Sequence, residues 1–326
     1  MRNGVLGLLG WMVLWLAGCA SVGTHAMVHP ARVTPRPWRD WAEVFANPVG
    51  VRVTAFVTGE VLVGPSILIE EDNPRTPRAL VVERWVPAVS YLIEHPTQGA
   101  VLLDTGVSPD HGRGCDYGVS PLFHIRCRAA GGQDIASQLA ARGIAGRDLR
   151  YVVVSHLHGD HAGGLHALLP RGGAVPVLLS RAEWESADSP IRAVRGYVAS
   201  IIDGDYPIAL LDLDRAPSMP ILGPSMDLFG DGSIWLLPMP GHTRGQLAAL
   251  INAPGAPLML TFDAAHLEAN VALQVPPGFV VDHDDAVASL ARIGRFHAAF
   301  SQVEMIYGHE PAQWAGRGER VELRPR

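Results

Sequence analysis

The first half of the chain alternates apolar and polar residues with the two-residue period of β-strands. Residues 49–63 form two such runs separated by Gly59, which predicts an antiparallel hairpin. Residues 91–94 and 100–103 predict two further strands joined by a short turn. Three consecutive valines at 152–154 predict a buried strand, because β-branched side chains pack well in a sheet.

The second half mixes strand patterns with helical ones. Apolar residues at helical spacing predict helices over 134–142, 165–169, 283–300 and part of 181–200. Residues 203–230 are rich in Pro and Gly and are predicted to be a connection. Strands are predicted at 176–180, 233–237, 246–252, 257–262 and 303–307. This order of elements predicts an α+β fold in which two packed sheets carry helices on their outer faces.

Composition narrows the class of protein. A chain of 326 residues, 48% of them hydrophobic, can fill a large core. The formal net charge is −6, and the 26 Lys and Arg residues form no basic stripe, so we expect no nucleic-acid partner. The same acidic balance disfavours polyanionic substrates.

Residues 1–19 differ from the rest of the chain. Arg2 is followed by an apolar run and then by small residues, which is the pattern of a secretory signal. The segment ends in Leu-Ala-Gly-Cys, which resembles the bacterial lipobox and implies that Cys19 becomes lipidated. Ala20 after the cysteine favours the outer membrane over the inner one, by the same resemblance. The expectation is an exported lipoprotein that faces the periplasm, and the alternative is an uncleaved N-terminal anchor.

The remaining chain divides into a tether and one domain. Residues 20–47 lack clear periodicity and are predicted to be a tether and irregular segment, followed by a domain over 48–326. If Cys19 carries lipid, Cys115 and Cys127 remain as a disulfide pair or as two free thiols. They lie in the Gly-rich insertion at 107–132, for which we expect a role as one wall of the substrate cleft.

Metal-ligating residue types gather directly after the valine strand. His156, His158, Asp160 and His161 lie within six residues. Because side chains alternate along an extended backbone, the first two can project from the same side, and a turn at Gly159 re-aims the other two. Imidazole and carboxylate groups are ligands that Zn²⁺ prefers, so the stretch predicts two neighbouring ligand sets. A single histidine here would more simply be a core or surface residue.

Further His and Asp residues come at later strand ends. His242, Asp263 and His309 each follow a predicted strand, and each alone is compatible with a polar residue that caps a loop. Asp104 begins an Asp-Thr-Gly sequence after the strand at 100–103, where on the residues alone it forms a strand-ending turn.

Taken together, these sequences resemble a known family. His156-x-His158-x-Asp160-His161 looks like the signature of the metallo-β-lactamase superfamily, and the Ala-Gly-Gly that follows resembles its lactonase branch. The sequences around His242, Asp263 and His309 resemble those of the N-acyl-homoserine lactonases, over roughly residues 85–315. The resemblance implies an αββα sandwich of two mixed β-sheets flanked by helices.

The resemblance also implies a ligand set for two divalent metal ions, with Zn²⁺ as the first choice. It gives His156, His158 and His242 to one ion. It gives Asp160, His161 and His309 to the other ion, with Asp263 as the bridge. By the same resemblance, Asp104 lies beneath the site and steadies the ligands.

A dinuclear set of this kind implies hydrolysis by a metal-bridging hydroxide. The implied substrate is a small-molecule lactone or ester, with N-acyl-homoserine lactones, and hence quorum quenching, as the first choice. Asp160 or a bound water is then expected to protonate the leaving alcohol. Those lactonases usually carry a tyrosine three residues after the bridging aspartate, where this chain has His266. His266 is expected to donate to the substrate carbonyl in its place, and the alternative is an ordinary polar residue.

Other activities share parts of this pattern. A glyoxalase II-like thioesterase or a phosphodiesterase uses the same seven ligands, whereas a true β-lactamase does not usually have the bridging aspartate. An alternative from a different functional class is a non-catalytic metal-binding lipoprotein. A complete dinuclear set favours a metal-dependent hydrolase.

Overall fold

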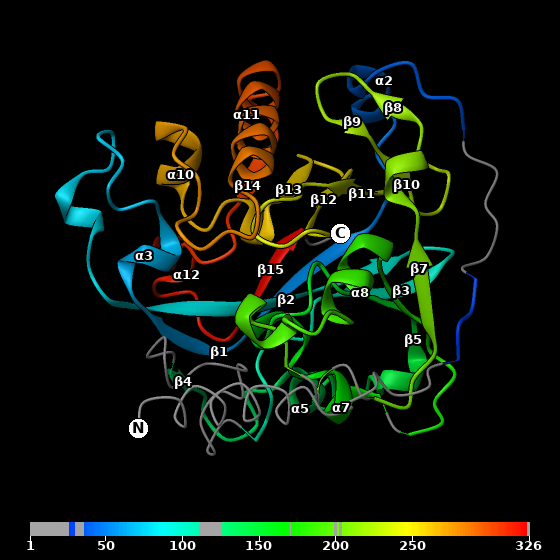
Figure 1. Cartoon of the computed structure of the whole chain (residues 1–326). Helices are drawn as coiled ribbons and strands as arrows, with labels where there is room; N and C mark the ends of the chain where they lie inside the picture. Colours follow the sequence, from blue (N-terminus) through cyan, green and yellow to red (C-terminus); the bar gives the residue numbers. More distant parts are fainter. Residues whose placement is uncertain are drawn as a thin grey trace, which may run out of the picture.

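The computed structural model describes residues 26–29, 36–110, 126–169, 171–198, 201 and 204–324. Two β-sheets pack face to face, and helices cover the outer face of each (Figure 1). Both sheets contain parallel and antiparallel pairs. The predicted αββα sandwich of two mixed sheets is therefore confirmed.

In the described part of the chain, the larger sheet has eight strands in the order β15-β1-β2-β3-β5-β6-β7, with β4 beside β1. The strands from β3 to β7 in this order run parallel, and the others pair antiparallel. The bounds are β1 Arg52–Val63, β2 Arg84–His95, β3 Gly99–Leu103, β4 Arg126–Arg128, β5 Leu149–Val153, β6 Val177–Ser180, β7 Ile208–Leu211 and β15 Arg320–Arg324.

The smaller sheet has the order β10-β11-β12-β13-β14, with one parallel pair between β13 and β14. A separate two-stranded ribbon, β8-β9, directly precedes β10 in the sequence. The bounds are β8 Ser218–Met219, β9 Gly223–Pro224, β10 Met226–Asp227, β11 Ile234–Pro238, β12 Leu247–Ile251, β13 Leu258–Leu260 and β14 Glu304–Ile306.

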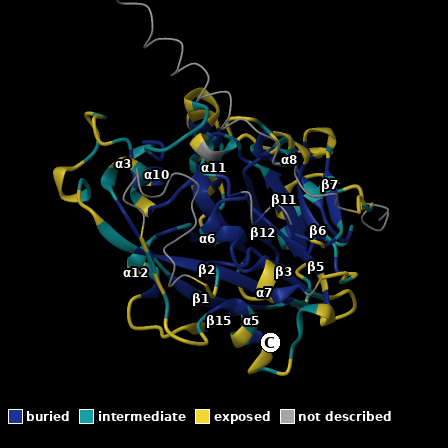
Figure 2. Ribbon diagram, turned by 60° about the horizontal axis from the view of Figure 1, so that its bottom comes forward, coloured by how far each residue is buried: buried dark blue, intermediate teal, exposed yellow. Residues whose placement is uncertain are grey.

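Helices close the two outer faces. Helices α5 and α7 bury their apolar residues against the outer side of the larger sheet, and α11 and α2 do the same on the smaller one. Figure 2 shows the strands buried and the exposed residues mainly on loops and helix surfaces. The helices are α2 Trp41–Phe45, α3 Pro65–Leu68, α5 Ile135–Ala140, α6 Gly159–Ala162, α7 Leu165–Leu168, α8 Arg181–Ala187, α10 Glu268–Leu273, α11 His283–Ala299 and α12 Pro311–Trp314. Short 3-10 turns are η1 Arg78–Leu80, η3 Gly146–Asp148, η4 Arg192–Arg195, η5 Leu213–Arg215 and η6 Phe262–Ala264.

Two expectations from the pattern were wrong. Residues 52–63 form one strand, β1, and the predicted hairpin over 49–63 is absent, because the chain at Gly59 makes a register shift within the pairing to β2. A Cβ atom on Gly59 would lie 2.7 Å from Val107, so the glycine permits close packing instead of a turn. Residues 203–230 are not only a connection, since they contain β7 to β10 and thereby an edge strand of each sheet.

Residues 41–45 pack against the smaller sheet as helix α2. Helix α2 lies within the segment expected to be irregular, and Trp41 is fully buried and donates its indole N–H to the Pro220 carbonyl. Within the ranges described, no helix has the length and apolar character needed to cross a membrane. Cys19 and Cys115 lie outside the described residues. Cys127 lies on β4 and is disulfide-bonded, and its pairing with Cys115 stays a prediction.

Candidate metal centre

Loops at the ends of four strands bring the predicted ligands together between the two sheets. His156 and His158 follow β5 and precede α6, which carries Asp160 and His161. His242 lies on the loop between β11 and β12, Asp263 lies on η6 after β13, and His309 follows β14. The larger sheet therefore supplies four ligands from one loop, and the smaller sheet supplies three from three loops.

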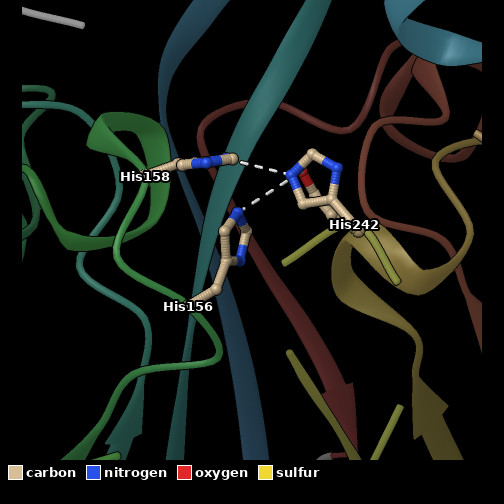
Figure 3. A group of neighbouring side chains, drawn as sticks. His156, His158 and His242 are labelled. Atoms are coloured by element: carbon tan, nitrogen blue, oxygen red, sulfur yellow. Dashed lines mark hydrogen bonds and ion pairs between the residues drawn. The ribbon is translucent and has the colours of Figure 1, made fainter. Parts of the chain in front are cut away.

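His156, His158 and His242 form the first cluster, together with Asp263. Their imidazoles converge from loops on opposite sides of the site (Figure 3). His242 Nε2 lies 2.9 Å from His158 Nδ1 and 3.2 Å from Asp263 Oδ2. All four residues are buried. Gly241 allows this approach, because a Cβ atom there would lie 2.3 Å from Ala286 Cα.

Asp160, His161 and His309 form the second cluster. His309 Nε2 lies 3.4 Å from Asp160 Oδ2, and His161 Nε2 lies 3.8 Å from the same oxygen. The side chain of Asp160 is 12% exposed, whereas the other six ligand residues are 7% exposed or less, so Asp160 is the ligand most open to a substrate.

Asp263 lies between the clusters and faces both. Its Oδ2 atom faces the first cluster, and its Oδ1 atom lies 3.1 Å from His161 Nε2 and 3.3 Å from His309 Nε2. One carboxylate oxygen for each cluster is the arrangement that a bridging ligand requires.

Each of the six histidines around Asp263 has one ring nitrogen held by an outer group. His158 Nε2 donates to the Arg195 carbonyl, His242 Nδ1 to the Phe279 carbonyl and His309 Nδ1 to the Pro87 carbonyl. His161 Nδ1 donates to Asp104 Oδ2, and His156 Nδ1 pairs with Ser155 Oγ. His266 Nδ1 pairs with the Leu68 carbonyl. Metal-ligating histidines are held in this way, because the outer bond fixes both the tautomer and the ring orientation.

Several polar atoms at the centre of the site have no hydrogen-bond partner within the described part of the chain. Among the described residues, His156 Nε2, His161 Nε2, His266 Nε2 and Asp263 Oδ1 are buried atoms with no hydrogen bond. Burying polar atoms without partners costs free energy, so a cluster of them in one place indicates that another group satisfies them. Imidazole nitrogens and carboxylate oxygens in these positions fit two divalent ions such as Zn²⁺.

The two clusters differ electrostatically. Burial holds the pKa values of His156 and His242 well below the ordinary histidine value. Burial alone would also lower the pKa of His161, but the carboxylates of Asp263, Asp160 and Asp104 raise it well above that value. The pKa of His309 is raised for a similar reason, with Asp263 as the strongest neighbouring charge. The histidines of the first cluster thus release a proton more readily than His161 and His309 of the second cluster do.

Asp104 lies beneath the second cluster. It accepts hydrogen bonds from the Ser155 N–H, the Ser155 hydroxyl and His161 Nδ1 at 2.6, 2.7 and 2.7 Å. Its backbone is left-handed, with φ at 57°, a conformation that Asp and Asn adopt more often than other non-glycine residues do. Phe262, next to Asp263, is also left-handed, and for this bulky residue the conformation is strained.

Sequence reasoning missed Glu183. This fully buried residue of α8 accepts hydrogen bonds from the N–H groups of Leu157 and Gly245 and from the Thr243 hydroxyl. It therefore ties the loop of His156 and His158 to the loop of His242. The sequence around it is Ser-x-x-Glu, which locally indicates a helix capping box, but the side chain of Ser180 makes no capping hydrogen bond.

Comparisons with known proteins agree with this site. The family model of the metallo-beta-lactamase superfamily matches residues 84–300. An N-acyl homoserine lactonase AttM of Azorhizobium caulinodans is 32% identical over 235 residues, which are 70% of this chain and 84% of that protein. An N-acyl homoserine lactonase of a Bacillus species is 28% identical over 240 residues, covering 71% and 84%.

Solved structures show the same fold. An N-acyl homoserine lactone hydrolase with the product N-hexanoyl-L-homoserine at its catalytic metal centre superposes with a TM-score of 0.62, at 23% identity, over 82% of this chain and 95% of that one. The dizinc quorum-quenching lactonase AidC superposes with a TM-score of 0.55, at 15% identity, over 85% and 96%.

The family model matches most of the chain. The chain in turn matches most of the length of its relatives. Together with two adjacent clusters of His and Asp ligands, this makes the chain a metal-dependent hydrolase that belongs to the metallo-beta-lactamase superfamily.

Proposed function

We propose that this protein opens the ring of a lactone, with N-acyl-homoserine lactones as the best candidate substrates. The observation that carries the proposal is the bridging position of Asp263 between two ligand clusters, in a chain about 30% identical to N-acyl homoserine lactonases. When bound, two divalent ions supply Lewis acidity and lower the pKa of a shared water towards neutrality.

Residues of the chain would supply the proton for the leaving alcohol and keep water away from the rest of the centre. Asp160 is the most exposed ligand side chain, so it is the carboxyl best placed to pass a proton to the leaving alcohol. The alcohol of an opened lactone stays attached to the acyl part, and the protonation must therefore occur within the site. Burial of the remaining ligands excludes water from the other sides of the centre.

We also propose that the protein is an exported lipoprotein held in the outer membrane through a lipid on Cys19, facing the periplasm. Support comes from the charged, apolar and small-residue order of residues 1–19. Replacing Cys19 by Ser should release the protein from the membrane fraction while its hydrolytic activity persists. Membrane association that survives in the Ser variant would contradict lipid anchoring.

The substrate proposal is tested on purified full-length protein loaded with Zn²⁺. Hydrolysis is measured in parallel on an acyl-homoserine lactone, a thioester, a phosphodiester and a β-lactam, with metal content determined on the same sample. We expect nearly two ions per chain and the highest kcat/KM on the lactone. Another preferred substrate would overturn the lactone assignment, and absence of both metal and turnover would favour a binding protein.

A further inference from the structure

One histidine of the site has the features of a metal ligand but is not one of the seven predicted ligands. His266 lies three residues after Asp263 and is fully buried. Its Nε2 atom lies 3.1 Å from Asp263 Oδ2, and this nitrogen has no hydrogen bond among the described residues. The ring is equally close to both clusters, since its centroid lies 5.2 Å from those of His242 and His309.

The Leu68 carbonyl decides which ring nitrogen carries the proton. It lies 3.3 Å from His266 Nδ1 and also accepts a hydrogen bond from the Asn270 side chain. A carbonyl oxygen has no proton to give, so Nδ1 must be the donor. The neutral ring therefore presents a lone pair on Nε2, towards Asp263. A neutral His266 in this tautomer has no Nε2–H with which to donate to a substrate carbonyl.

The same arrangement recurs at the neighbouring ligands. His242 and His309 also donate Nδ1–H to a backbone carbonyl and direct Nε2 at Asp263. The backbone joins His266 to His309, because the His309 N–H donates to the His266 carbonyl at 2.8 Å. Ligand atoms of Asp263, His266 and His309 all lie within 4.8 Å of one another.

We infer that His266 is an eighth metal ligand, which binds one of the two ions through Nε2 beside Asp263. This inference rests on the dinuclear centre of the proposed function and not on the lactone substrate. It adds one imidazole to the ligands of that ion. Added nitrogen ligands favour Zn²⁺, Co²⁺ or Ni²⁺ over Mg²⁺ and Mn²⁺, which prefer oxygen.

The test measures metal affinity on the full-length protein. Zn²⁺ is titrated into metal-free protein in competition with a chromophoric chelator, and Co²⁺ is titrated separately while its visible absorption is recorded. In His266→Ala, we expect the affinity for one of the two ions to fall by more than the roughly 10- to 100-fold that loss of an outer partner causes. The Co²⁺ absorption should change for that ion alone. His297→Ala, on the exposed face of α11, is the matched control and should bind both ions normally.

A second variant separates a ligand from a hydrogen-bond donor. His266→Gln keeps an N–H donor but lacks the imidazole lone pair, so it should lose affinity as the Ala variant does. It also provides the measurement if the Ala variant does not fold, as judged by circular dichroism. Zn²⁺ affinities and Co²⁺ spectra that match the wild type in either folded variant would overturn the inference. Neither readout depends on which ester the enzyme cleaves, so failure here is distinct from failure of the substrate proposal.

Discussion

The two clusters of the metal centre are supported by different parts of the fold. The second cluster is held by the larger sheet, because His161 donates to Asp104 directly after β3 and His309 donates to Pro87 on β2. The first cluster is held by loops, since His158 donates to Arg195 and His242 to Phe279. The position of the second ion thus depends on strand pairing, and the position of the first ion depends on how the loops pack against each other.

Each cluster also has one buried carboxylate behind it. Asp104 contacts a ligand directly, through His161 Nδ1. Glu183 contacts no ligand side chain and instead joins the backbone and hydroxyl groups of two ligand loops. Burial raises the pKa of both carboxyl groups. The difference indicates that Asp104 controls the chemistry of a ligand, whereas Glu183 controls the distance between loops.

The largest effect is expected where the clusters meet. Asp263→Asn removes the negative charge that both clusters share, so we expect metal content well below two ions per chain and kcat/KM lower by roughly 10²- to 10³-fold or more. Metal analysis and hydrolysis are measured on the same sample. Retention of both ions with normal turnover would show that the clusters act independently and would contradict a bridging role.

Asp104→Asn should affect the second cluster selectively. Asparagine tolerates the left-handed backbone of Asp104, so the variant removes the charge with little added strain. Loss of the carboxylate behind His161 should weaken binding of one ion by about 10- to 100-fold. Chelator competition should show the other ion weakened less, because Asp104 reaches its ligand His156 only through the Ser155 hydroxyl. Equal weakening of both ions would mean that Asp104 supports the whole loop and not one ligand.

The pH dependence of metal binding should also distinguish the clusters. Neighbouring carboxylates raise the pKa values of His161 and His309 in the metal-free protein, so both histidines bind a proton more tightly, and this proton must leave when an ion binds. Affinity for the second ion should therefore fall as the pH drops, by about tenfold per unit for each proton released. The pKa values of His156 and His242 are lowered, so affinity for the first ion should stay nearly constant. Calorimetric titration in several buffers measures the protons released, and equal release by the two ions would remove this distinction.

Glu183→Ala should have the smallest effect on metal affinity and a clear effect on stability. It leaves the N–H groups of Leu157 and Gly245 and the Thr243 hydroxyl without their buried acceptor, which costs about 2 kcal/mol in the free energy of unfolding. Affinity for the first ion should fall only a few-fold, because no ligand loses a direct partner. Glu185→Ala, on the same helix, is the control for helix propensity. An unchanged urea midpoint in Glu183→Ala would contradict a role in joining the loops.

Much of the site could be predicted because its signals are local. His156, His158, Asp160 and His161 follow one valine-rich strand, and each later candidate also comes at a strand end. Glu183 could not be predicted in the same way. Its side chain takes part in the site through Leu157, Thr243 and Gly245, which belong to loops far away in sequence.

The fold shows the same division. The strands β11 to β14 have compact apolar runs and were found from the pattern, since burial on both faces leaves a strong sequence signal. Strand β15, with alternating charged residues, was not found, because its assignment comes from antiparallel pairing with β1 about 260 residues earlier. The local sequence around Gly59 predicts a turn. The register shift in its pairing with β2 and its close contact with Val107 make it a bulge instead.

The sequence by itself determined which residue types could bind metal and their order along the chain, because ligand chemistry depends on the side chain and strand ends are local features. The tertiary structure alone decided which nitrogen of each histidine faces the centre. That choice depends on distant carbonyls such as those of Leu68, Arg195 and Phe279. Each accepts a hydrogen bond and cannot donate one, so the ring nitrogen facing it must carry the proton.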